Sequence, residues 1–471
     1  MRGAWIVAGI YVAIQIALVL YRWHILTITS DTGLFAQAIL NAGHGFANTP
    51  ESGSHFKFHF SPILATLYPL VALTHNALSL QFAQIVLIAL TAPALTLLFT
   101  PYVSEQLRWR LALIALLYAP LGVLGFAEFH ELAFFPVIAV ALLWAADREL
   151  WGWFAALGVC GIFTREDVGI ELCLIGIGVA AFVWVRRREH RERGLILGEP
   201  HHATATAVAF GALGVVSAAV ISAYFHVISA RFASWLPGSD YDYPISHGPL
   251  GLVAALATRP FEAIPAVFNV GKLTYVLEGL LPLVLLPLRS YWSLLALPAL
   301  LIIELASNSA MWNMGRHYSA MWAPWFLVAT GAALARIERD HGLDAARTWT
   351  NAAIIGCVVV LVAFNPMHLG VTLRSAYHDP ASAHAALACV PRGASIDTHE
   401  EWFAQIAAAN PRSTHSQATG ADYLVYASDY HDYAWPSTAP KVAAEVRAGD
   451  YTPVCRFGNV VTYKRREGRV R

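Results

Sequence analysis

The stretch ALSLQFAQIVLIALTAPALTLLFT, residues 77–100, decides the class of fold. It contains no charged residue, and as a helix rising about 1.5 Å per residue it is long enough to cross about 30 Å of hydrocarbon. Over the whole chain 57% of the residues are hydrophobic and 13% are charged, whereas soluble proteins carry about 25% charged residues. The sequence therefore predicts an all-α polytopic membrane protein.

Similar apolar runs recur along the chain, and we expect about eleven transmembrane helices. The run 4–21 lacks a small-residue cleavage site, so we expect it to remain as a span. The run 151–185 is too long for one crossing and is split at residues 165–167. The apolar segment 60–73 is too short to cross and is expected to be interfacial or re-entrant. The expected spans lie near 4–21, 77–100, 110–126, 132–146, 151–163, 168–185, 205–229, 272–288, 290–305, 318–335 and 350–366.

The placement of arginines predicts the orientation of these spans. RRREHRER, residues 186–193, falls in one short loop that we expect to face the cytoplasm. Counting spans outward from it places the N-terminus in the cytoplasm and the C-terminus outside the inner (plasma) membrane. Most ionisable loop residues then gather on the outer face, which is typical of an active-site rim. The loops on that face are 22–76, 127–131, 164–167, 230–271 and 306–317.

The composition changes after Pro366. We therefore expect a transmembrane domain over 1–366 and a small soluble α/β domain over 367–471, outside the membrane. Strands are predicted at GASIDTH (393–399), ADYLVYAS (421–428) and VCRFGNVVTYKR (454–465), the last a hairpin. Helices are predicted at HAALAC, EEWFAQIAAA and APKVAAEVRA. In an oxidising compartment Cys389 and Cys455 could form a disulfide.

The segment TSDTGLFAQAILNAGHG, residues 29–45, supplies the first candidate site residue. Ser30 or Asp31 can cap an amphipathic helix that we expect to lie on the membrane surface. If Ser30 is the cap, the Asp31 carboxylate is free to act as a general base toward an acceptor hydroxyl. If Asp31 is the cap, its role is structural. Both interpretations remain open at this point.

The stretch SHFKFHFSP, residues 54–62, places His55, Lys57 and His59 among three phenylalanines. On a helix the two histidines would share a face, which suits two ligands of a metal. The strict alternation instead favours an extended strand with His55, Lys57 and His59 on the polar side and the phenylalanines toward lipid. Lys57 would then face a phosphate. A plain interfacial strip of polar and aromatic residues is the alternative.

AEFHE, residues 127–131, carries Glu128, His130 and Glu131 at a turn between apolar runs. Two carboxylates and an imidazole could bind a divalent cation or share a proton. A solvated polar turn is the alternative, although three ionisable groups so close to hydrocarbon are costly unless they are satisfied.

Two arginines on the expected outer face are candidates for binding an anion. Arg165, in TREDVGIE, could bind an anionic group or form an internal ion pair with its acidic neighbours. Arg316 and His317, in NSAMWNMGRHYSAMW, lie at the outer end of a span, and a guanidinium group is suited to phosphate oxygens. The tryptophans around them are typical of the interfacial belt and indicate little more.

The combination of SDTGLFAQAILNAGHGF (30–46), ESGSHFKFHFSPIL (51–64), TREDVGIEL (164–172) and GRHYSAMWAPWFLVA (315–329) resembles a family of prokaryotic membrane proteins known as domain of unknown function 2079. The resemblance spans nearly the whole chain. That family is grouped with the GT-C glycosyltransferases, which use polyprenyl-phosphate-linked sugars on the outer face. The resemblance implies a GT-C-like fold, with Asp31 in the place of the acidic motif after the first span. Thr32 follows Asp31, so the adjacent acidic pair common in GT-C enzymes is absent.

We therefore expect a GT-C-like transferase that moves a sugar from a polyprenyl-phosphate carrier in the lipid bilayer to an acceptor hydroxyl. Asp31 is the expected base, while Lys57, Arg165, Arg316 and His317 are expected to stabilise the leaving phosphate. A divalent metal, Mg or Mn, is the candidate cofactor. The alternatives are a transporter or flippase of a lipid-linked or anionic solute and a non-catalytic protein of envelope assembly. With a net charge of zero, nothing indicates a nucleic-acid partner. The candidate metal ligands are His55, His59, Glu128, His130 and Glu131.

Overall fold

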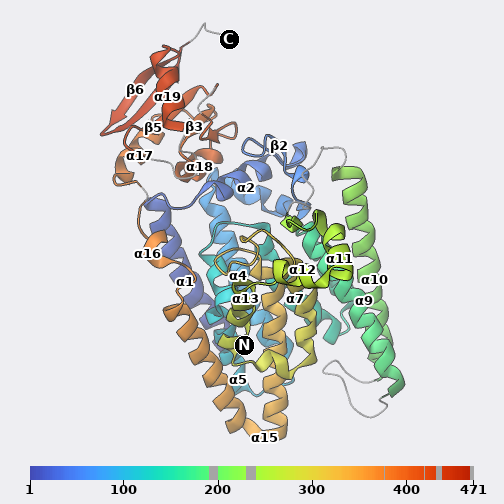
Figure 1. The fold of residues 1–471 in the computed structure, drawn as a ribbon. Coiled ribbons are helices and arrows are strands. Elements are labelled where there is room, and N and C mark those ends of the chain that lie inside the picture. The colour runs from blue at the N-terminus through green and yellow to red at the C-terminus, as the bar shows by residue number, and fades with distance from the viewer. Residues whose placement is uncertain (190–199, 230–239, 376, 418–419, 431–437, 467–471) are drawn as a thin grey trace.

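The computed structural model describes the chain except for residues 190–199, 230–239, 376, 418–419, 431–437 and 467–471 (Figure 1). The α-helices are α1 (Arg2–His24), α2 (Ser30–Leu40), α3 (Tyr68–Thr74), α4 (Leu78–Phe99), α5 (Glu105–Leu117), α6 (Ala119–Gly122), α7 (Phe135–Asp147), α8 (Trp151–Ile162), α9 (Glu166–Glu189), α10 (Pro200–Ala223), α11 (Gly248–Thr258), α12 (Pro260–Val267), α13 (Val270–Leu280), α14 (Leu297–Glu304), α15 (Ser319–Ala363), α16 (Leu369–Thr372), α17 (Pro380–Ala388), α18 (Glu400–Ala407) and α19 (Thr438–Arg447).

Short 3-10 turns and strands complete the described chain. The 3-10 turns are η1 (Ala42–His44), η2 (His55–Lys57), η3 (Pro62–Leu67), η4 (Val123–Gly125), η5 (Glu131–Phe134), η8 (Leu281–Leu283), η9 (Leu286–Arg289) and η10 (Tyr291–Ala296), and η6 (Tyr224–Ser229) is a π-helix. The strands are β1 (Ala47–Asn48), β2 (Gly53–Ser54), β3 (Ile396–Thr398), β4 (Thr414–His415), β5 (Tyr423–Ala427), β6 (Tyr451–Phe457) and β7 (Val460–Arg465).

Within the described residues, five helices are long and apolar enough to cross a membrane, or seven if each of two bent pairs counts as one span. They are α1, α4, α9, α10 and α15, with the bent pairs over residues 105–125 and 260–283. The expectation of about eleven spans is not confirmed. One reason is that the apolar run 272–305 breaks into short turns at its prolines, where Val284 and Leu285 take positive φ angles. The expected break near residues 165–167 is confirmed, because α8 ends at Ile162 and α9 begins at Glu166.

The long helix α15 is two arms joined at Gly342, where φ is 85° and ψ is 171°. A left-handed φ of this kind favours glycine, which has no Cβ to clash. The arms diverge from this turn (Figure 1) and correspond to the expected spans 318–335 and 350–366. The first arm lies in the core of the bundle, where Trp322 and Trp325 are fully buried. The Trp325 indole donates to the buried Glu171 carboxyl of α9, which fixes these two helices side by side.

The two ends of the bundle differ in what they carry. At one end lie α2, the β1–β2 hairpin and the C-terminal domain, whereas the turn of α15 and the last turns of α9 lie at the other (Figure 1). Arg186, Arg187 and Arg188 belong to those last turns of α9, while Arg191 and Arg193 lie outside the described residues. The ionisable loops therefore lie at the end opposite to the arginine-rich segment.

The C-terminal domain contains a sheet with strand order β4-β3-β5-β7-β6. Strand β3 pairs in parallel with β4 and β5, and β7 pairs antiparallel with β5 and β6. The predicted strands, the β6–β7 hairpin and the three predicted helices of this domain are confirmed. Cys389, at the end of α17, and Cys455, in β6, form a disulfide, which settles the possibility that the sequence left open.

Helix α2 forms where the sequence predicts it, but its surroundings differ from the prediction. Thr29 rather than Ser30 or Asp31 is the N-cap residue, and no side chain caps the helix. The helix packs against α18 and the chain that follows it: Ser30 donates to Glu400 (2.9 Å) and Gln37 donates to the carbonyl of Ser413 (2.8 Å). Helix α2, which carries Asp31, is therefore held against the C-terminal domain.

Candidate functional site

Gln84 of α4 holds the loop that carries the central site residues. This buried side chain accepts from the backbone N–H of His130 (2.9 Å) through Oε1. Its Nε2 donates to the carbonyls of Leu124 (2.7 Å), Ala127 (3.0 Å) and Glu128 (3.1 Å). An apolar helix tolerates a buried amide only where its hydrogen bonds are satisfied. Here that requirement fixes the loop 124–130 against α4.

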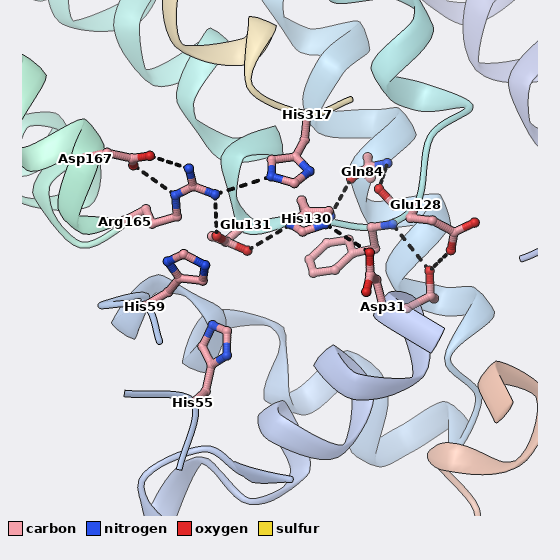
Figure 2. A network of polar contacts seen from close by, with 12 residues as sticks. Asp31, His55, His59, Gln84, Glu128, His130, Glu131, Arg165, Asp167 and His317 are labelled. Atoms are coloured by element: carbon pink, nitrogen blue, oxygen red, sulfur yellow. Dashed lines mark hydrogen bonds and ion pairs between the residues drawn. The ribbon is translucent and has the colours of Figure 1, made fainter. Parts of the chain in front are cut away.

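Glu128 joins α1 to α2 and is not directed at the other candidate ligands (Figure 2). It accepts from the Nη2 of Arg22 (2.9 Å), at the end of α1, and from the hydroxyl of Thr32 (2.9 Å), in α2. Arg22 is itself buried and also donates to the carbonyls of Thr27 and Phe126. Glu128 is thus an internal partner of a buried guanidinium group.

Asp31, His130, Glu131 and Arg165 form a continuous line of alternating charge (Figure 2). The Nε2 of His130 lies 3.4 Å from Oδ2 of Asp31, and its Nδ1 lies 3.6 Å from Oε2 of Glu131. Oε1 of Glu131 lies 3.4 Å from Nη1 of Arg165. The Asp31 side chain is 40% exposed, whereas that of Glu131 is fully buried. The line therefore runs from an accessible carboxylate into the protein.

Arg165 and His317 close the buried end of this line. Arg165, just before α9, forms a two-point ion pair with the carboxylate of Asp167 in the first turn of that helix. Its Nη1 also lies 3.4 Å from Nε2 of His317. The His317 ring stacks on His130, with ring centroids 3.4 Å apart. Four separate loops thus meet at one cluster, as the sequence predicts.

The surroundings push the pKa values of the two stacked histidines apart. Burial lowers the pKa of His130, but its contacts with Asp31 and Glu131 outweigh burial and raise it to about 9. Burial and the positive charges of His130 and Arg165 hold the pKa of His317 well below its usual range. At neutral pH one ring is therefore cationic and the other neutral, an arrangement that separates proton donors from acceptors.

The two carboxylates beside His130 remain ionised. Burial raises the pKa of Asp31, but the hydrogen bond and charge of His130 and the charge of Arg316 bring it below its usual value. Burial likewise opposes ionisation of Glu131, and His130 and Arg165 hold its pKa well below the usual range. Asp31 is thus an accessible carboxylate that stays charged near neutral pH.

The stretch 54–62 is not the extended strand that its alternation predicts. Residues His55–Lys57 form the 3-10 turn η2, capped by the Ser54 hydroxyl, and His59 follows it. The ring of His55 is buried and contacts the Glu51 carboxylate (2.9 Å), so it faces inward rather than toward a polar rim. The prediction of lipid-facing phenylalanines is also wrong for Phe60, which is buried. Local contacts of Ser54 and Glu51, which alternation does not reveal, stabilise the turn here.

His59 and Lys57 lie on different sides of this turn. His59 contacts Oε1 of Glu166 (2.7 Å), and the backbone N–H of Phe60 donates to the other oxygen of that carboxylate (2.7 Å). Burial opposes a charge on His59, but Glu166 outweighs it and raises the pKa of His59. The Lys57 ammonium donates to the Ser52 carbonyl (3.2 Å) at the surface. Of the two, only His59 belongs to the buried cluster.

The predicted metal ligands do not converge. In the described part of the chain, no group of three or more His, Cys, Asp or Glu side chains is arranged to hold a metal ion. Glu128 is bound by Arg22, His55 by Glu51 and His59 by Glu166. His130 and Glu131 neighbour each other, but with Asp31 and Arg165 they form ion pairs. The donor set thus fits internal charge pairing and not Mg or Mn.

Arg316 is the accessible cation of the site. Its side chain is exposed, and among the described residues no hydrogen bond or ion pair engages its guanidinium group. Its charge nevertheless acts on Asp31, whose pKa it lowers. Arg165 differs because its guanidinium group is buried and already occupied by carboxylates.

Sequence reasoning missed three residues that build the site: Gln84, Arg22 and Phe35. The Phe35 ring makes edge-to-face contacts with two imidazole rings, that of His55 (centroids 5.4 Å apart) and that of His130 (5.1 Å apart). Phe35 therefore separates the two imidazoles. Gln84 stands in the middle of the apolar run 77–100, where a polar residue needs a partner. A polar residue at this position indicates a buried partner, and the sequence alone shows it. Nothing local marked Arg22 or Phe35.

A search of curated proteins finds no match to this chain. A comparison with protein-family models matches residues 22–446 to a family described as "predicted membrane protein (DUF2079)". The match includes every site residue named above and most of the C-terminal domain. The chain therefore belongs to the DUF2079 family of predicted membrane proteins.

Proposed function

We propose that this protein is a membrane glycosyltransferase that moves a sugar from a polyprenyl-phosphate carrier to an acceptor hydroxyl at the end of the bundle that carries Asp31. One observation carries the proposal: an accessible, ionised carboxylate lies beside the cationic His130 and the exposed Arg316. A base next to positive charge is what sugar transfer from a phosphate requires. The resemblance to GT-C enzymes agrees with it.

In this reaction the acceptor oxygen attacks the anomeric carbon while the bond from that carbon to the phosphate oxygen breaks. The proton of the acceptor hydroxyl passes to Asp31. Polyprenyl phosphate is the leaving group, and its phosphate oxygen keeps the electrons of the broken bond. The low pKa of Asp31 keeps it unprotonated before the attack. His130 holds the carboxylate from behind and limits its rotation.

The leaving phosphate needs positive charge more than a proton donor. Arg316 fits this role best, because its guanidinium group is exposed and the described residues leave it unoccupied. Lys57 is a second, half-buried cation on the same end, and its ammonium donates to the Ser52 carbonyl. Arg165 and His317 are better assigned to positioning, since Arg165 is held by Asp167 and Glu131 and His317 is a neutral ring stacked on His130.

An apolar groove near this cluster suits the chain of a lipid-linked donor. Its volume is about 680 Å³, in the range of pockets that take sizeable ligands. Phe134, the last residue of η5, lies in its wall, and η5 begins at Glu131. Val86 of α4 is 44% exposed, so the groove opens on an apolar flank. The lining residues are Leu67, Leu70, Thr74, Asn76, Leu78, Ser79, Phe82, Ala83, Val86, Leu87 and Phe134.

The test is incubation of the purified protein, in lipid nanodiscs, with a panel of polyprenyl-phosphate sugars and separation of the products. We expect loss of one donor and release of polyprenyl phosphate. Asp31→Asn should lower the rate by at least about 100-fold, since it removes the base. Asp344→Asn is the matched control, because Asp344 is 96% exposed at the opposite end. Arg316→Gln should weaken donor use, and Arg316→Lys should restore part of it.

Full activity of Asp31→Asn would overturn the assignment of the base. If no donor in the panel is consumed, but the wild-type protein moves an intact lipid-linked sugar across a vesicle membrane, the protein is a transporter and the transferase proposal is wrong.

A further inference from the structure

A small basic cavity lies at the end of the bundle opposite to Asp31. It has a volume of about 100 Å³ and lies where η9 meets the first arm of α15. Pockets for drug-sized ligands measure about 300–1,000 Å³, so this one admits only a small group. Its lining consists of Arg289, Ala333, Arg336, Ile337, Asp340 and His341.

The two arginines of this cavity retain most of their hydrogen-bonding capacity. Arg336 donates from Nη1 to the backbone carbonyl of Arg289 (3.3 Å). The guanidinium carbon of Arg289 lies 5.3 Å from the centre of the Trp349 ring, and this stacking uses none of its N–H donors. Each guanidinium group has five N–H donors. In the part of the chain that the structure describes, no carboxylate pairs with either group.

The one acidic residue of the lining is neutralised by another arginine. Oδ1 of Asp340 accepts from Nε of Arg339 (2.9 Å), and Oδ2 lies 3.5 Å from its Nη2. The lining therefore carries two arginines, Arg289 and Arg336, against this one carboxylate, which leaves a net positive charge. Two neighbouring guanidinium groups repel each other, and a phosphate group that takes N–H bonds from both would remove that repulsion.

The surface around the cavity is apolar, which indicates the source of such a phosphate. Leu288, the neighbour of Arg289, is 61% exposed, and Leu285 and Leu294 of the same segment are also exposed. The Phe182 ring of α9 contacts Tyr291, so the last turns of α9 with Arg186–Arg188 approach the same end. A basic pocket beside lipid-facing leucines is the arrangement that binds phospholipid headgroups.

We propose that Arg289 and Arg336 bind the phosphate of an anionic membrane lipid at this end of the protein. The site is separate from the Asp31 cluster and does not depend on sugar transfer. Its function is to hold a lipid of the leaflet that faces the arginine-rich end, which the sequence predicts to be the cytoplasmic one.

The experiment measures lipid binding to the full-length protein by native mass spectrometry and by thermal stability in detergent. The probes are phosphatidylglycerol, zwitterionic phosphatidylcholine and inorganic phosphate. Phosphatidylglycerol should bind and raise Tm, whereas the other two should not at equal concentration. Arg289→Gln with Arg336→Gln should weaken phosphatidylglycerol binding at least about tenfold. Arg110→Gln with Arg347→Gln is the control, because it removes the same charge from two residues that do not line the cavity and should change binding less than about twofold.

If both double variants lose phosphatidylglycerol binding equally, the lipid is held only by the general positive charge of this end, and the proposed site is wrong. Protection by inorganic phosphate alone would overturn the lipid assignment in favour of a soluble anion. Binding of phosphatidylcholine as tightly as phosphatidylglycerol would contradict a role for the arginines. Sugar transfer by Asp31 is measured separately and does not enter any of these outcomes.

Discussion

The two ends of the helix bundle hold their charges in different ways. At the Asp31 end, several buried ion pairs join residues far apart in the sequence, as for Arg22 with Glu128 and Arg165 with Glu131. At the opposite end the described pairs join residues close in the sequence, and most are exposed, as for Arg347 with Asp344. Buried charges persist only when they are paired, so the first kind ties elements together. Local, exposed pairs contribute little, which leaves the arginines of that end free for other partners.

The largest effect that separates the two ends should come from Arg165→Gln. The substitution leaves the fully buried Glu131 carboxylate with one cationic neighbour fewer. Breaking a buried pair costs about 3–5 kcal/mol of free energy of unfolding. Chemical denaturation in detergent measures this cost. Adding Glu131→Gln should recover part of the loss, because the double variant no longer buries an unmatched charge. No recovery would mean that the two residues act independently.

A smaller effect should appear as a pH dependence of stability at the Asp31 end. The pKa of His130 is raised from 6.5 to about 9 in the folded protein. Protonated His130 therefore contributes on the order of 3 kcal/mol to the free energy of unfolding. This contribution is complete below pH 6.5 and is lost as the pH rises through 9. Thermal melts from pH 6 to pH 10 should show Tm falling over this window. His130→Gln should flatten the fall, and an unchanged slope in that variant would assign the titration to another group.

The contact between α2 and the C-terminal domain offers a third, smaller test. A Cβ on Gly33 would lie 2.6 Å from the Phe403 ring and 3.1 Å from Cα of Ala404. Gly33→Val should force α18 away from α2 at a cost of about 1–3 kcal/mol. Gly9→Val is the control, since nothing lies within 4 Å of a Cβ there. Faster proteolysis of the C-terminal domain in Gly33→Val only would confirm the coupling, and equal protection in both would contradict it.

Much of this architecture is predictable from the sequence, but the partners within the site are not. The apolar run 77–100 predicts α4, and the alternation in the last hairpin predicts β6 and β7, because each pattern is local. The prediction that His130 and His317 lie at the same end is confirmed by the stacking of their rings, while the side of the membrane that this end faces stays a prediction. The pairing of Glu128 with Arg22 is decided by packing across 106 positions.

The wrong predictions at the site share a cause. The expected strand and the His55–His59 metal pair both rest on residue spacing within one short segment. Glu51 lies four residues before His55 and takes it as a partner. Glu166 comes from a distant helix and claims His59. Spacing identifies which side chains are available, and tertiary contacts decide which partner each one takes.

The smallest effect should come from the arginine-rich end, where the charges are local. Arg347→Gln removes the partner of Asp344, whose side chain is 96% exposed, at a distance of 3.1 Å one helical turn away. Water and salt replace such a contact, so Tm should change by less than about 2 °C. Thermal melts of Arg347→Gln and Arg165→Gln under the same conditions test it, because both substitutions remove one positive charge. A loss comparable to that of Arg165→Gln would mean that exposed pairs here stabilise the turn of α15 at Gly342, and that the contrast between the two ends does not hold.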